Sequence, residues 1–174
     1  ADPEALTELC NAARLRHVYV DLPGPGAPSV VTNNFHGAEL LTRKILDEMP
    51  AVSDPGLGRP YFFGGASSDH ATTRRIAGFK ASLAAAGMPV EADQIIECGY
   101  TRVSAQREAA ALCERLGGLP AGLFVNSLTV FEGALAHFVT LPPSAFAQTV
   151  VGCYDYDPFA AFLQFPVHML RQNA

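Results

Sequence analysis

Four polar or aromatic residues follow apolar segments of the sequence, and their side chains suit the binding of a small polar molecule. The guanidinium of Arg75 can donate a fork of hydrogen bonds to hydroxyl, carboxylate or phosphate oxygens. The amide of Asn126 offers a donor and an acceptor, and the carboxylate of Asp155 suits two adjacent sugar hydroxyls. Tyr100 can stack on the apolar face of a sugar ring. Together these residues favour a binding site for a polyhydroxylated ligand.

Each of these residues also has a purely structural interpretation. Arg75 can lie on a solvated helical turn, and Tyr100 can be an ordinary half-buried tyrosine. Asn126 can cap the helix that follows it, although Ser127 can do the same. Asp155 can cap the next helix along the chain. The sequence leaves both interpretations open for every one of them.

The stretch from residue 59 to residue 172 alternates between apolar runs and amphipathic segments. The apolar runs predict strands, and the amphipathic segments predict helices that end at glycines such as Gly87 and Gly117. Expected strands cover residues 60–63, 95–97, 122–125 and 149–154, and expected helices cover residues 72–86, 104–116 and 128–138. This alternation is typical of an α/β fold with a mostly parallel, doubly wound sheet. In such sheets ligands bind outside the carboxyl ends of the strands, where the four residues above are expected.

The first 57 residues show a less regular pattern. A helix is expected from Asp2 or Pro3, followed by short strands at residues 17–21 and 29–32. A second helix is expected to begin at Asn33 or Asn34. Residues 53–58 are rich in proline and glycine, so they predict a linker or domain boundary.

Composition excludes several classes of protein. Apolar residues make up 49% of the 174 residues and charged residues 17%, which indicates an ordered core. A net charge of −5 argues against nucleic-acid binding by this segment, and no apolar run reaches the roughly 20 residues of a membrane span. The four cysteines are widely spaced, which predicts reduced thiols of a cytoplasmic protein. The histidines lack metal-site spacing, and neither a cofactor motif nor an acid/base pair is apparent, so no metal, cofactor or enzymatic activity is predicted.

Six segments of the chain carry a recognisable pattern in order: residues 32–38, 62–65, 75–79, 124–135, 150–155 and 170–172. They resemble the effector-binding core of LacI/GalR-type transcriptional regulators, whose R-x-x-G-F, N-D-x-x-x-x-G-A-L and G-F-D signatures they match. Residues 162–167 are most similar to the branch of fructose repressors (catabolite repressor/activators).

The resemblance implies a periplasmic-binding-protein-like fold of two α/β lobes with the effector between them. It implies that residues 1–57 are the latter part of the first lobe, residues 58–167 the second lobe, and residues 168–174 a crossover strand back toward the first. The chain is then expected to be a fragment with one lobe incomplete. The operator DNA would be bound by a helix-turn-helix outside this sequence, and the protein would act as a homodimer without contacting a membrane.

The resemblance assigns effector contacts to Arg75, Asn126 and Asp155, and an aromatic wall to Tyr100. It places Asn34 and His36 near the contribution of the first lobe. The sequence departs from the family at Ser127, where the family has Asp, and in the Gly152–Asp155 turn, which is shifted by one residue.

The expected ligand is a sugar or sugar phosphate, with fructose 1-phosphate suggested by the branch. Two other classes remain open. One is a periplasmic sugar-binding protein of a transport system, and the other is an α/β enzyme such as a phosphosugar isomerase.

Overall fold

The computed structural model describes residues 2–172, which divide into two compact units between Asn33 and Asn34. The first unit contains α1 (Pro3–Ala12) and a parallel pair of short strands, β1 (Tyr19–Val20) and β2 (Ser29–Val30). Asp2 caps α1 through a 3.1 Å hydrogen bond from the Glu4 amide, as the sequence predicted. Both strands are shorter than the predicted segments.

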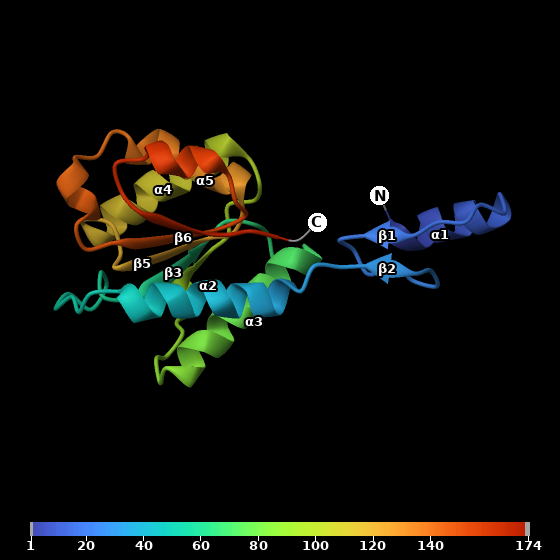
Figure 1. Cartoon of the computed structure of the whole chain (residues 1–174), viewed down its shortest axis with the longest axis horizontal. Helices are drawn as coiled ribbons and strands as arrows, with labels where there is room; N and C mark the ends of the chain where they lie inside the picture. The colour runs from blue at the N-terminus through green and yellow to red at the C-terminus, as the bar shows by residue number, and fades with distance from the viewer. Residues whose placement is uncertain (1, 173–174) are drawn as a thin grey trace. The chain divides into compact units, whose positions relative to one another are not determined.

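The second unit is a parallel five-stranded sheet with helices on both faces, in the strand order β4-β3-β5-β6-β7 (Figure 1). The α/β class and the mostly parallel sheet expected from the sequence are therefore confirmed. Its strands are β3 (Pro60–Phe63), β4 (Ile95–Ile96), β5 (Gly122–Val125), β6 (Val150–Tyr154) and β7 (Val167–Leu170). Its helices are α2 (Asn34–Glu48), α3 (His70–Ala85), α4 (Arg102–Leu116) and α5 (Leu128–Phe138), with short 3₁₀ turns at Ala92–Gln94, Pro143–Phe146 and Pro158–Phe162.

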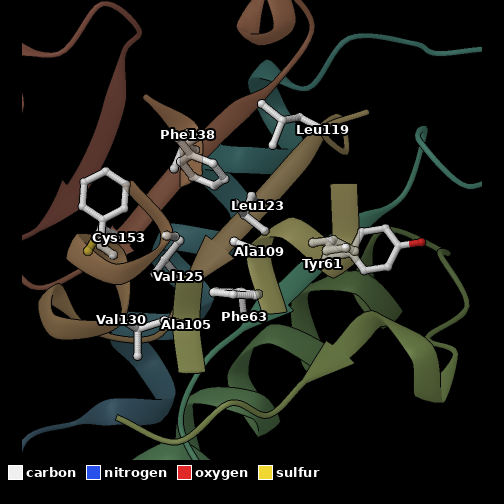
Figure 2. Close-up of a cluster of buried hydrophobic side chains, with 14 of the residues drawn as sticks. Tyr61, Phe63, Ala105, Ala109, Leu119, Leu123, Val125, Val130, Phe138 and Cys153 are labelled. Atoms are coloured by element: carbon white, nitrogen blue, oxygen red, sulfur yellow. The ribbon is translucent and has the colours of Figure 1, made fainter. Parts of the chain in front are cut away.

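Side chains of the central strands alternate between two hydrophobic clusters, because successive residues of a strand point to opposite faces. On β5, Leu123 and Val125 pack toward α4 and α5, whereas Phe124 packs toward α2 and α3. Figure 2 shows the first cluster, with Leu123 and Val125 at its centre. In the second cluster the rings of Phe124 and Phe62 stack with centroids 4.9 Å apart. Both faces of the sheet are thus covered, which explains why its strands are apolar at nearly every position.

Glycines let the helices on each face approach closely. A Cβ atom on Gly78 of α3 would lie 3.0 Å from the Cβ of Ala38 and would collide with the carbonyl oxygen of Phe35, both on α2. On the other face, a Cβ atom on Gly133 of α5 would lie 2.5 Å from the carbonyl oxygen of Arg102 on α4. These close contacts fix the distance between α2 and α3 on one face of the sheet and between α4 and α5 on the other.

The boundary between compact units differs from the one that the proline- and glycine-rich residues 53–58 predicted. Helix α2 lies before those residues, yet its apolar residues Ala38, Leu41 and Ile45 pack into the core of the second unit. Residues 53–58 therefore form a connection inside that unit. Strand β7 extends the same sheet by pairing with β6, and the end of the predicted crossover, residues 173–174, lies outside the described residues.

Candidate functional site

Four strands of the second unit end at the same edge of the sheet, because all of them run parallel. Gly65 follows β3, Tyr100 follows β4, Asn126 follows β5 and Asp155 follows β6. Gly65 has a φ of +74°, and a Cβ atom there would lie 2.5 Å from the amide nitrogen of Asn126, so only glycine fits. The loop after β3 can therefore pass directly over the Asn126 side chain.

Arg75 lies in the first turns of α3 and is only 7% exposed. Its Nε donates to Oδ1 of Asn34 at 2.8 Å, and its Nη1 donates to the carbonyl oxygen of Asn126 at 2.5 Å. Its guanidinium carbon lies 3.7 Å from the ring centroid of Tyr154, a cation–π geometry. The arginine therefore joins the start of α2, the end of β5 and the end of β6. Its neighbour Arg74 is exposed, as expected of a solvated helical turn.

Asn126 is completely buried, and its amide belongs to a cluster of polar side chains. Its Nδ2 donates to Oγ1 of Thr72 at 3.2 Å and to the hydroxyl of Tyr100 at 3.3 Å. The hydroxyls of Thr72 and Tyr100 lie 2.5 Å apart, and that of Tyr100 donates to Asp69 at 2.8 Å. Ser127, not Asn126, caps α5. The amide of Asn126 is thereby available to the cluster instead of the helix end.

The cluster shifts the pKa values of its two acidic groups in opposite directions. Burial acts to raise the pKa of the Asp69 carboxyl, but hydrogen bonds from Thr72 and Tyr100 and the charge of Arg75 outweigh burial and hold that pKa below its usual value. Burial raises the pKa of the Tyr100 phenol, and the neighbouring Asp69 carboxylate raises it further. At neutral pH the pair is therefore an ionised carboxylate and a neutral phenol.

Asp155 lies beside the loop between β5 and α5, and its carboxylate contacts other parts of the protein. Its Oδ2 accepts a 3.3 Å hydrogen bond from the backbone amide of Leu128, in the first turn of α5, and its Oδ1 accepts from the side chain of Gln172. Its φ of +113° is rare for a residue with a side chain. Asp155 thus ties the start of α5 to the segment after β7. Helix α5 precedes Asp155 in the chain, whereas the sequence suggested that Asp155 might cap the helix that follows it.

The structure separates the two site residues expected near the start of α2. Asn34 is buried and bonded to Arg75, so it belongs to the cluster. His36 is exposed and lies 3.5 Å from Glu39 on the same helix. Of the six residues expected at the site, Arg75, Asn126, Tyr100 and Asn34 are connected through the cluster, Asp155 borders it, and His36 contacts a surface carboxylate.

Three residues of the cluster escaped the sequence-based selection: Asp69, Thr72 and Tyr154. Asp69 caps α3 by accepting from the Thr72 backbone amide at 2.8 Å, and an aspartate just before an amphipathic segment is a helix-start signal that several neighbouring polar residues share. Tyr154 is the last residue of β6, and the alternation of side chains places its ring on the face of α2 and α3, beside Arg75.

The assembled groups suit a neutral or anionic polar ligand. Two of the five N–H groups of Arg75 are engaged by Asn34 and Asn126, and a buried guanidinium forms strong, directional hydrogen bonds to oxygen. Tyr100 is 41% exposed, and its ring offers an apolar face next to these polar groups. Polar donors beside an aromatic face are what a sugar ring requires.

Comparisons with known proteins point to one class of protein. No family model matches the chain. A ribitol operon repressor from Klebsiella aerogenes is 44% identical over 45 residues, which are 26% of this chain and 17% of the repressor. A sucrose operon repressor from Klebsiella pneumoniae is 35% identical over 77 residues, 44% of this chain and 23% of that protein.

A solved structure of the Cra transcriptional dual regulator from Pseudomonas putida, in complex with fructose 1-phosphate, has the same fold. The two structures superimpose with a TM-score of 0.82 at 20% sequence identity. The superposition covers 99% of this chain and 61% of the Cra chain. The chain therefore spans less than two thirds of each of these proteins. Other structures of LacI-type regulators superimpose similarly. The chain therefore resembles the effector-binding core of LacI-type transcriptional regulators. The resemblance covers nearly the whole chain in fold and shorter stretches in sequence.

Proposed function

We propose that this chain is the effector-sensing part of a bacterial LacI-type transcriptional regulator, and that a sugar or sugar phosphate binds at the carboxyl edge of its second unit. The observation that carries the proposal is the buried guanidinium of Arg75, which is held at three points by Asn34, Asn126 and Tyr154. Burying a cation is costly unless hydrogen bonds compensate for lost water. A fold that maintains such a group at a ligand-binding edge gains a strong donor for ligand oxygens.

The organisation of the whole protein follows from the same proposal. Residues 34–167 form most of the second lobe, residues before 34 belong to the first, and the chain returns toward the first lobe after β7. Operator DNA is bound by a helix-turn-helix domain elsewhere in the protein, which acts as a homodimer in the cytoplasm. The effector favours one arrangement of the lobes, and the dimer transmits that population shift to the DNA-binding domains.

The relatives favour a regulator over a transport protein. The two curated relatives are operon repressors, and the solved structure with fructose 1-phosphate is a transcriptional regulator. Among residues 2–172 no helix is long and apolar enough to cross a bilayer. Fructose 1-phosphate is the first ligand to test, because the structure that contains it covers almost the entire chain.

The test is thermal unfolding of the full-length protein with a panel of sugars and their phosphates. A ligand at about 100 times its Kd stabilises the native state by about 2.7 kcal/mol, which a melting curve resolves. The same ligand should release operator DNA in a fluorescence-anisotropy titration. The Arg75→Lys variant should lose both responses, whereas Arg74→Lys, on the exposed side of the same turn, should retain them.

Two results would contradict the proposal. One is a ligand that stabilises Arg75→Lys as strongly as the unaltered protein, which would place the binding site elsewhere. The other is turnover of a panel sugar, detected by product analysis, which would indicate an enzyme.

A further inference from the structure

A chain of hydrogen bonds leads from Asn126 to a carboxylate that the family resemblance did not assign to the site. Oδ2 of Asp69 accepts from the backbone amide of Thr72 and from the hydroxyl of Tyr100, both at 2.8 Å. The Tyr100 hydroxyl contacts that of Thr72 at 2.5 Å. Nδ2 of Asn126 contacts both hydroxyls. Four side chains therefore share one connected network.

The carboxylate fixes the direction of every hydrogen bond in this network. An ionised carboxylate can only accept, so Tyr100 must give its single hydroxyl hydrogen to Asp69. The Tyr100 oxygen can then only accept, so the 2.5 Å contact requires Thr72 to donate its single hydrogen to Tyr100. Both hydroxyl oxygens now present lone pairs toward Asn126, whose side chain must meet them with its NH2 end. The opposite orientation of the amide would place three acceptors against one another.

This order leaves the other end of the Asn126 amide as an acceptor. Oδ1 of Asn126 is buried and has no hydrogen-bond partner among residues 2–172. A buried acceptor without a partner costs about 1–3 kcal/mol. The hydroxyl oxygens of Thr72 and Tyr100 lie too close together to take one hydrogen each, so they share a single N–H of Nδ2. A ligand that bonds to Oδ1 must therefore be a donor. The Tyr100 oxygen has given its hydrogen and accepted two, which leaves its ring face for the ligand.

We propose that Asp69 is a positioning residue of the effector site: through Tyr100 and Thr72 it holds the Asn126 amide with Oδ1 as the acceptor, so that the effector must present a hydroxyl or N–H donor there. The inference rests on the proposed function, because it concerns the same site. It adds a residue outside the expected set and a chemical requirement on the ligand. A sugar hydroxyl meets that requirement, whereas a phosphate oxygen does not.

The first experiment needs no ligand. The full-length protein is labelled with 3-fluorotyrosine, and the ¹⁹F resonance of residue 100 is assigned from its loss in Tyr100→Phe. Asp69→Asn retains an oxygen that can cap α3 but removes the charge. The control Asp157→Asn makes the same change at another cap, where the carboxylate accepts from the Phe159 amide at 3.0 Å.

The expected result is a downward shift of the residue 100 titration in Asp69→Asn and no shift in Asp157→Asn, because the Asp69 carboxylate opposes ionisation of the phenol. An unchanged titration in Asp69→Asn would overturn the inference. Since this readout involves no ligand, it remains decisive if the identity of the effector has been misjudged.

The second experiment measures fructose 1-phosphate affinity by calorimetry on the same variants. Loss of one oriented hydrogen bond should weaken binding about fivefold in Asp69→Asn. Tyr100→Phe breaks the same network, so the two effects on affinity should not add. The double variant should bind less tightly than Asp69→Asn, but this additional loss should be smaller than the loss that Tyr100→Phe causes alone. Equal affinities of Asp69→Asn and the unaltered protein would overturn the inference. Failure of fructose 1-phosphate to bind the unaltered protein would count against that ligand, while the fluorine titration would still decide the role of Asp69.

Discussion

Replacing Arg75 by lysine should destabilise the protein although the charge is retained. The guanidinium bonds to Asn34 and Asn126 in two directions while it stacks on Tyr154. A lysine ammonium is a point charge and cannot maintain both hydrogen bonds and the flat contact. One lost hydrogen bond to a charged group costs about 1.5–3 kcal/mol, and a desolvated cation–π contact contributes about 2 kcal/mol. Because the ammonium retains part of the attraction to the ring, we expect a total loss of about 3 kcal/mol in unfolding free energy.

Urea unfolding followed by circular dichroism measures this loss, and Arg74→Lys is the matched control. Arg74 is exposed, and its guanidinium carbon lies 5.1 Å from the ring centroid of Phe35, so its replacement should cost less than about 1 kcal/mol. Equal midpoints for the two variants would refute the conclusion that the buried guanidinium holds three elements together.

Three further predictions follow from contacts elsewhere in the second unit. Gly78→Ala should lower the unfolding free energy by about 2 kcal/mol, because the new methyl group meets the α2 backbone at Phe35; an unchanged urea midpoint would show that the helices can separate without cost. Asp69 has a lowered pKa when folded, so it stabilises the protein above its ordinary pKa of about 3.8, and that contribution disappears as pH falls through the lower, folded value. The unfolding free energy, measured between pH 2 and pH 6, should therefore depend less on pH for Asp69→Asn than for the unaltered protein. Burial raises the pKa of the Cys98 thiol to about 11 and that of Cys153 still further, so iodoacetamide at pH 8 should modify both only after denaturant is added, as peptide mass spectrometry would detect.

The sequence predicted the core elements of the second unit almost residue by residue. Strands β3 and β5 and helix α5 have the expected bounds, because apolar runs between glycines and cap residues mark both of their ends. Helices α3 and α4 each begin two residues earlier than expected. Asp69 and Thr101 cap them, and a polar residue in a polar loop gives a weak signal among several candidate caps. The first residues of α3 and α4 are thus set by hydrogen bonds of the cap side chains, which the pattern of apolar residues cannot predict.

The site was harder to predict than the fold, because its contacts join residues far apart in the sequence. The predicted alternation of strands and helices placed Arg75, Asn126 and Tyr100 at one edge, because the carboxyl ends of parallel strands meet there. It could not show that Arg75 contacts the backbone of Asn126 and the ring of Tyr154, since those contacts depend on rotamers and helix orientation. Asp155 illustrates the same limit. Its place at a strand end is the one expected, but the sequence could not show that its carboxylate accepts from the Leu128 amide.

The loop between β5 and α5 connects these separate contacts. Arg75 donates to the carbonyl oxygen of Asn126, at the end of the strand, and Asp155 accepts from the amide of Leu128, at the start of the helix. These bonds hold the loop from both sides, at a point where the chain changes direction. A ligand that draws Arg75 toward its own oxygens would weaken the hold on Asn126, while Asp155 continues to link Leu128 with Gln172. If a ligand binds at Arg75 as proposed, its binding would be linked physically to the segment after β7 through the two loop residues Asn126 and Ser127, the start of α5 and the carboxylate of Asp155.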